Sequence, residues 1–83
     1  MEHALKIWPK YFNVVLGGSK KFEYRSNDRG FKVGDILILQ EWDPTTEEYT
    51  GNWCRAFVTY LLEGGRVPKG LCIMSIEVPE VYA

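Results

Sequence analysis

The sequence lacks the long apolar runs that cross membranes. No uninterrupted apolar stretch among its 83 residues approaches the ~18 residues that a membrane-spanning helix needs. The opening segment, MEHALKIWPK, lacks the order of charged, apolar and small residues that marks a secretory signal. From these two absences we expect a cytoplasmic protein that has no membrane partner.

Cysteine and histidine are scarce as well. Cys54 and Cys72 lie in apolar segments, and His3 is the single histidine. No CxxC or HxxxH spacing is present to begin a tetrahedral metal site, and we expect neither a metal nor a cofactor. Small secreted domains carry more cysteines, and free cysteine is often buried, so we predict two reduced, buried thiols. We expect His3 to be structural or exposed rather than reactive.

Length and charge set the broad class. Residues 1–83 suit one domain, and 46% hydrophobic with 25% charged residues is typical of a soluble globular protein. Residues 1–32 carry a net charge of +4, whereas residues 33–83 carry −5. If the basic side chains gather on one face, that face suits a polyanionic ligand; if they scatter, they only solvate the surface.

The pattern of apolar residues predicts a mostly β protein with one short helix. Apolar runs bounded by turn residues predict strands at residues 3–7, 21–25, 36–39, 52–63 and 71–78. After Pro9, apolar residues recur at helical spacing until two glycines end the segment. We expect an α+β fold in the form of a small β-barrel of about five or six strands, with the helix after the first strand, because closure removes exposed strand edges.

A cluster of charges follows the predicted helix, in the stretch GGSKKFEYR at residues 17–25. Strand alternation puts Phe22 and Tyr24 on one face, and Lys21, Glu23 and Arg25 on the other. An arginine there suits a phosphate or carboxylate ligand because its planar fork binds two oxygens. The alternative is a solvated strand whose surface ion pairs contribute little.

Aromatic residues are numerous for a chain of this length. We expect Phe12, Phe22 and Phe57 to fill the small core. Trp42 and Trp53 flank a polar turn, and they belong either to the core or to a surface that stacks on bases.

Several short motifs occur in a fixed order along the chain. Residues 18–25 have the form G-x-K-x-x-E-x-R, and residues 33–35 read V-G-D. The others are His3-x-x-Lys6, Tyr11-Phe12, Asn27-Asp28-Arg29, Glu41-Trp42 and Tyr49-Thr50-Gly51. Together they resemble the ASCH domain, a relative of the RNA-binding PUA domains. The closer resemblance is to a small bacterial and phage family of ASCH-like proteins of unknown function, and it spans nearly the whole chain.

This resemblance implies a five- or six-stranded barrel with a cleft between barrel and helix. In the wider superfamily the cleft is proposed to hold RNA or a nucleotide-like ligand. Lys20, Glu23 and Arg25 would map to its wall, and residues 27–29 to its rim. The match of His3 to the motif makes it a secondary candidate for the cleft.

One branch of ASCH-like proteins is catalytic, and it supplies an alternative. Those amidohydrolases remove an acyl group from a modified cytidine and are thought to use a lysine, a threonine three residues later and a distant glutamate. Lys20 matches the lysine, but Glu23 stands where the threonine would be. A carboxylate does not simply replace an alcohol nucleophile, so the same reaction is disfavoured, while a Lys20–Glu23 acid–base pair stays open.

Three functional hypotheses result. The first is an RNA- or nucleotide-binding module whose expected site residues are Lys6, Lys20, Glu23, Arg25, Asn27, Arg29 and Trp42. The second is a small metal-independent hydrolase of a modified nucleoside or RNA that uses Lys20 and Glu23. The third is a phage or bacterial protein-interaction module that binds its partner through Trp42, Trp53 and the acidic turn at 41–48.

Overall fold

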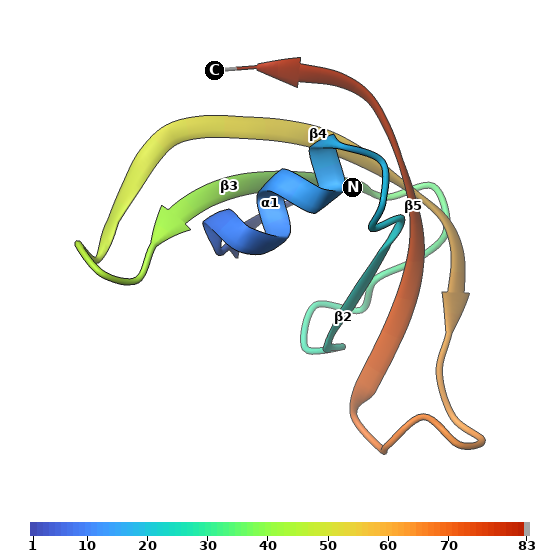
Figure 1. Cartoon of the computed structure of the whole chain (residues 1–83). Helices are drawn as coiled ribbons and strands as arrows, with labels where there is room; N and C mark the ends of the chain where they lie inside the picture. Colours follow the sequence, from blue (N-terminus) through green and yellow to red (C-terminus); the bar gives the residue numbers. More distant parts are fainter. Residues whose placement is uncertain (83) are drawn as a thin grey trace.

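The computed structural model describes residues 1–82, with side chains described up to residue 79. The elements are, in order, β1 (Glu2–Ile7), α1 (Pro9–Leu16), β2 (Phe22–Ser26), β3 (Ile36–Asp43), β4 (Glu48–Leu62) and β5 (Leu71–Tyr82) (Figure 1). The predicted mostly β class, with one short helix after the first strand, is confirmed. Four of the five strands are longer than predicted, and β3 continues to Asp43 while β5 runs through Pro79; β2 keeps the predicted length but lies one residue later.

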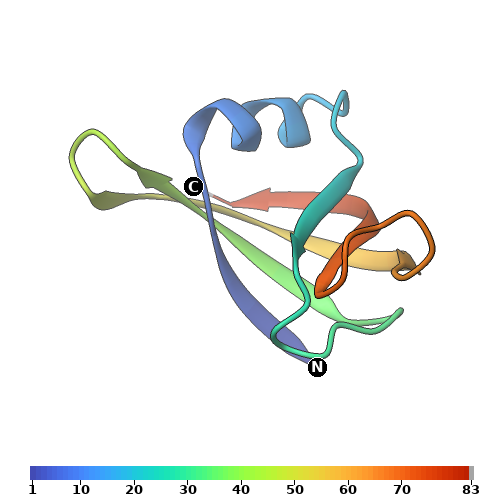
Figure 2. The ribbon, with the colours of Figure 1, turned by 90° about the horizontal axis from the view of Figure 1, so that it is seen from below.

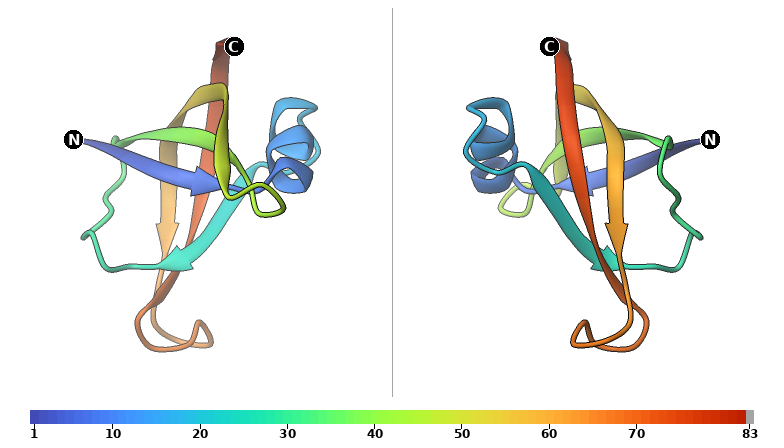
Figure 3. Two further views of the ribbon diagram at one scale, coloured as in Figure 1. Left: turned by 90° about the vertical axis from the view of Figure 1, so that its left-hand side faces the viewer. Right: turned by 90° about the vertical axis from the view of Figure 1, so that its right-hand side faces the viewer.

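The five strands form one curled sheet in the order β1-β3-β4-β5-β2. β1 pairs with β3 in parallel, and the other three pairings are antiparallel. β1 and β2 are the two edge strands of this sheet. Because the sheet bends into a half-barrel, these two edges come close to each other (Figure 3). The predicted barrel is therefore present as a curled sheet whose two edges meet at a seam.

The core lies on the concave side of this sheet. In β1, burial alternates so that His3, Leu5 and Ile7 face inward. The helix α1 packs against β3 and β5 and contributes Phe12 and Val15 to the same core (Figure 2). Pro9 starts the helix without losing a hydrogen bond, and Gly18 follows it with φ of 83°, a conformation that glycine adopts at no steric cost.

Both cysteines are buried and free, as predicted. Burial raises the pKa of the Cys54 thiol to about 11, and the negative charge of Glu23 adds to this rise. Burial also raises the pKa of Cys72. Neither thiol is therefore an activated nucleophile, since a reactive cysteine needs an exposed, stabilised thiolate.

The direction in which β2 faces differs from the sequence prediction. Phe22 and Tyr24 are 46% and 51% exposed, whereas Glu23 is only 3% exposed and points into the interior. The prediction that Phe22 lies in the core is wrong, while Phe12 is buried as expected and Phe57 is half-buried. The inward position of Glu23 is sustained because two cationic side chains bind its carboxylate.

Within residues 1–82, no helix is both long enough and apolar enough to span a lipid bilayer.

Candidate functional site

A pocket of about 500 Å³ opens between the end of β1, the start of α1 and β2. It therefore lies at the seam where the two edges of the sheet approach each other. Four of the seven expected site residues line it, namely Lys6, Lys20, Glu23 and Arg25. Four aromatic residues complete most of the lining, and each is exposed by more than two fifths: Trp8, Tyr11, Phe22 and Tyr24.

The centre of the pocket wall is a buried carboxylate held by two cations. Lys20 Nζ lies 2.8 Å from Glu23 Oε1, and Arg25 Nε donates to Glu23 Oε2 at 2.8 Å. Each carboxylate oxygen therefore has its own cationic partner, which fixes the side chain and compensates its burial. Lys20 Nζ also lies 5.0 Å from the centre of the Phe22 ring, within the range of a cation–π contact.

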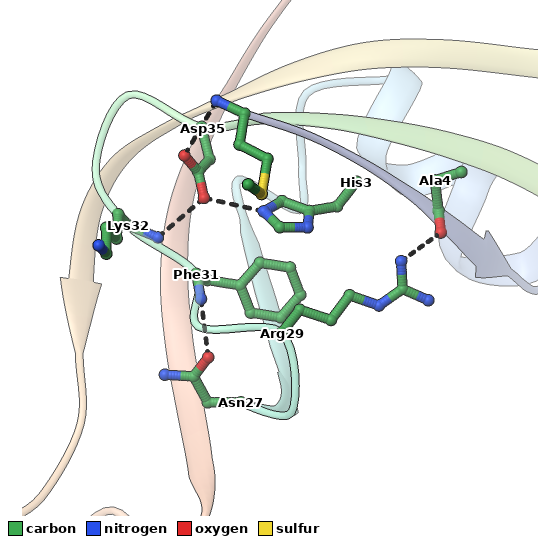
Figure 4. Close-up of polar contacts among 8 residues, drawn as sticks. His3, Ala4, Asn27, Arg29, Phe31, Lys32 and Asp35 are labelled. Carbon is green, nitrogen blue, oxygen red and sulfur yellow. Dashed lines mark hydrogen bonds and ion pairs between the residues drawn. The ribbon is translucent and has the colours of Figure 1, made fainter.

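Arginine side chains bridge the two edges of the sheet at the seam. Arg25 Nη2 donates to the carbonyl oxygen of Lys6 at 2.7 Å. Arg29 Nη1 donates to the carbonyl oxygen of Ala4 at 3.0 Å (Figure 4). These guanidinium groups satisfy two carbonyls on the outer edge of β1 and so connect β1 to β2 and to the loop that follows β2.

The remaining expected residues lie outside the pocket lining. Asn27 Oδ1 accepts from the backbone N–H of Phe31 at 2.9 Å, and its Nδ2 donates to Glu63 Oε2 at 2.8 Å. Asn27 thus connects the loop after β2 to the loop after β4, and Arg29 connects the former to β1, whereas the resemblance places both residues at the rim of the cleft. Trp42 is half-buried, and Lys6 Nζ lies 4.1 Å from the centre of its ring. Trp42 therefore contacts a pocket residue but does not line the pocket itself.

His3 is buried and structural. Its Nε2 lies 2.9 Å from Asp35 Oδ2, and its ring meets that of Phe31 edge to face at 4.8 Å between centroids (Figure 4). Asp35 also accepts from the backbone N–H of Lys32 at 3.0 Å. The hydrogen bond from His3 is the main reason why the pKa of Asp35 lies below its ordinary value, although burial opposes the shift. This cluster anchors the loop between β2 and β3 and lies apart from the pocket lining.

The Asp35 cluster predicts how stability depends on pH. A carboxyl whose pKa is lowered on folding stabilises the protein above its unfolded value of 3.8, and this contribution disappears as the pH falls through the lower folded value. We expect Asp35→Asn to lower the free energy of unfolding by about 1–2 kcal/mol at neutral pH, because it weakens hydrogen bonds to a charged group. Urea unfolding at neutral pH and below pH 3.8 should show the difference from wild type shrinking in acid. Asp28→Asn, at an exposed position, is the control and should change little at either pH; a pH-independent loss for Asp35→Asn would contradict the prediction.

Glu41 is a buried carboxylate whose surroundings the sequence did not reveal. It lies in β3 beside a register shift between Gln40 and Trp42, and its Oε1 accepts from Thr50 Oγ1 at 2.6 Å and from Asn52 Nδ2 at 3.2 Å. The acidic surface predicted at residues 41–48 is therefore smaller than expected, because the carboxylate of Glu41 faces inward. Its partners could have been found only from the register of the β3–β4 hairpin.

Comparison with known proteins assigns the family. The sequence model described as a domain of unknown function (DUF3850) matches residues 2–76, and the chain belongs to this family. An uncharacterized 12.9 kDa protein in the GpA 3′ region of Escherichia phage P2 is 42% identical over 57 residues, which are 69% of this chain and 50% of that protein. The chain thus spans about half the length of this curated relative. The expected relationship to a small family of unknown function with a phage member is confirmed.

Proposed function

We propose that this member of the DUF3850 family is a cytoplasmic, PUA/ASCH-like module that binds RNA or a nucleotide in the pocket between β1, α1 and β2. The observation that carries the proposal is the convergence of Lys6, Lys20 and Arg25 on one pocket rimmed by exposed aromatic rings. Neither feature alone would suffice, because surface lysines and exposed rings are both common.

The charge of the pocket favours an anionic ligand. Its lining holds three cations and one carboxylate, in a chain whose net charge is −1. The carboxylate belongs to Glu23, which is buried and already paired, so a ligand meets mainly the cationic groups. Lys6 is the most accessible of them, while Arg25 keeps N–H groups beyond the two that Glu23 and the Lys6 carbonyl engage. Phosphate oxygens are the acceptors that such groups bind best.

The aromatic rim favours a ligand with flat apolar faces. Trp8, Tyr11 and Phe22 present exposed ring surface beside the cations. Bases stack on such rings, with about 1–3 kcal/mol per base. The volume of about 500 Å³ falls within the roughly 300–1,000 Å³ of small-molecule sites. A phosphate and a base together match both halves of the pocket, as a nucleotide does.

The geometry favours binding over hydrolysis by Lys20 and Glu23. A lysine that activates a nucleophile must give up its proton, yet Lys20 forms an ion pair at 2.8 Å with a buried carboxylate. Glu23 is in turn engaged by Arg25. The pair is thus arranged to hold charge in place, which suits the wall of a binding site.

Fluorescence anisotropy with labelled single-stranded RNA, hairpin RNA and duplex DNA tests the proposal. We expect RNA affinity that falls steeply with salt, and a loss of about 3- to 10-fold for Lys6→Ala, with a smaller salt slope because one phosphate contact is gone. Lys32→Ala removes an exposed cation outside the pocket and serves as the matched control. Absence of binding, salt-independent binding, or an equal loss in both variants would contradict the proposal.

The hydrolase alternative has its own readout. Incubation with acylated cytidines and with RNA, followed by chromatography, would reveal product if Lys20 and Glu23 react. Turnover that Lys20→Gln abolishes, in a variant that still unfolds cooperatively, would replace the binding module by an enzyme.

A further inference from the structure

The outer face of β4, β5 and β2 carries two rows of side chains that extend beyond the pocket. Strand pairing aligns residues across the three strands, and residues directly opposite each other share a face. The first row consists of Tyr60, Ser75 and Phe22, and the second of Leu62, Ile73 and Tyr24. The row between them, which contains Glu23 and Met74, faces the interior.

Apart from the small polar side chain of Ser75, these two rows form an exposed apolar surface, named here the outer aromatic face. Tyr60 is 61% exposed, Tyr24 51%, Phe22 46% and Leu62 45%. Single exposed apolar residues are ordinary on a folded protein, but a contiguous group of them marks a site of interaction. No element among residues 1–82 covers these four side chains, as their exposure shows.

The outer aromatic face is continuous with the pocket. Phe22 and Tyr24 line the pocket and also form the end of each row, because β2 is the edge strand between the two surfaces. Lys20, which holds Glu23 in the pocket wall, lies over the Phe22 ring. A chain-like ligand that leaves the pocket across β2 therefore meets Tyr24 or Phe22 first and Tyr60 next.

The chemistry of the outer aromatic face points to unpaired nucleotides. It offers flat rings and contains no carboxylate in either row, while Lys20 and Lys21 precede its first residue along the chain. Exposed rings on a sheet surface stack two or three unpaired bases in other single-strand-binding folds. Bases inside a duplex are already stacked on each other, so a double helix cannot use such rings.

We infer that the outer aromatic face is a second subsite for single-stranded RNA, whose first nucleotide lies in the pocket and whose following bases stack on Tyr24 or Phe22 and then on Tyr60. This inference rests on the proposed function and specifies its ligand as an unpaired oligonucleotide. Phe22 and Tyr24 are two residues apart on one strand, a distance of about 6.6 Å, and adjacent strands lie about 4.8 Å apart. The face is therefore wide enough for one or two further bases.

Calorimetric titration with a uridine mononucleotide and with uridine oligonucleotides of increasing length tests this inference. For the wild type we expect affinity to rise with length beyond one nucleotide. Tyr60→Ala should leave mononucleotide binding unchanged and lower oligonucleotide affinity by about 5- to 100-fold, the effect of one lost stacking contact. The side chain of Tyr60 is 61% exposed and forms no hydrogen bond with the described residues, so truncating it should not disturb the fold. Tyr49→Ala, at a tyrosine 55% exposed in the β3–β4 hairpin, is the matched control and should behave as wild type.

The possible failures are distinguishable. In one case the mononucleotide binds and Lys6→Ala lowers its affinity, but Tyr60→Ala keeps the full increase in affinity with oligonucleotide length. This result overturns the inference while the proposed function stands. If neither the mononucleotide nor any oligonucleotide binds, both are wrong. Sedimentation of wild type and Tyr60→Ala decides a third case. A dimer that the substitution dissociates without changing RNA affinity would assign the outer aromatic face to protein association and overturn the inference.

Discussion

Replacing Lys20 and Arg25 together by alanine should lower the free energy of unfolding by about 3–5 kcal/mol. Both oxygens of Glu23 would lose their partners, at 2.8 Å each, while the carboxylate stays buried with 4% of its side chain exposed. An uncompensated charge in such a position is among the most destabilising defects in a folded protein. A chain of 83 residues has roughly 4–12 kcal/mol of stability in total, so the loss is a large share of it.

Urea unfolding followed by circular dichroism measures this loss, and a triple variant is its control. Lys20→Met/Glu23→Leu/Arg25→Met replaces the ion triad by apolar side chains of similar size, and we expect it to recover most of the stability. We expect similar free energies of unfolding for the wild type and the triple variant, and a much lower value for the double variant. A double variant as stable as wild type would mean that water compensates Glu23, contrary to its burial.

This result bears on how the proposed function is tested. In a variant without Lys20 and Arg25, a lower affinity for any ligand would combine the loss of contacts with the loss of stability. Lys6 is the better probe because it is exposed and because, among the side chains that the structure describes, its ammonium group contacts the face of the Trp42 ring and forms no ion pair. The triple variant adds a second probe, since it is expected to keep the fold while it removes the charge of the pocket wall.

The order of elements could be predicted from the sequence because its signals are local. Pro9 and the glycines that follow Leu16 bound the helix, and apolar alternation marks the strands. Which face of β2 meets the core could not be predicted in this way. Alternation separates Phe22 from Glu23, but the inner side is decided by Met74, which comes from a strand far along the chain.

The candidate site was only partly foreseeable for the same reason. Four of the expected residues line one pocket because three of them lie on or just before a single strand and Lys6 lies on the opposite edge of the sheet. Arg29 and Asn27 share their polar character with pocket residues, yet they bind Ala4 and Phe31. Hydrogen bonds between side chains and the backbone leave no periodic trace in a sequence, and the bond from Arg29 to Ala4 joins residues 25 positions apart, so its role appears only when the seam is assembled.

Phe31→Ala is the second substitution for which we expect a large loss of stability, and Phe22→Ala is its control. Phe31 is 2% exposed, contacts the His3 ring edge to face, and is tied to Asn27 through its backbone N–H (Figure 4). Phe31→Ala would leave a cavity in the core and remove this aromatic contact, at an expected cost of about 3–5 kcal/mol. Phe22→Ala truncates a ring that is 46% exposed, and we expect it to cost less than about 1 kcal/mol.

Urea denaturation of the two variants tests the observed orientation of β2 directly. The substitution is the same, so the two unfolding curves differ only through the surroundings of the two rings. The loop that Phe31 anchors also carries Arg29, whose guanidinium binds the outer edge of β1. Phe31→Ala should therefore loosen the seam, and hydrogen exchange of the β1 amides should become faster than in Phe22→Ala. Equal losses of stability in the two variants would show that Phe22 is packed inside, as the sequence alone had suggested, and would remove it from both the pocket rim and the outer aromatic face.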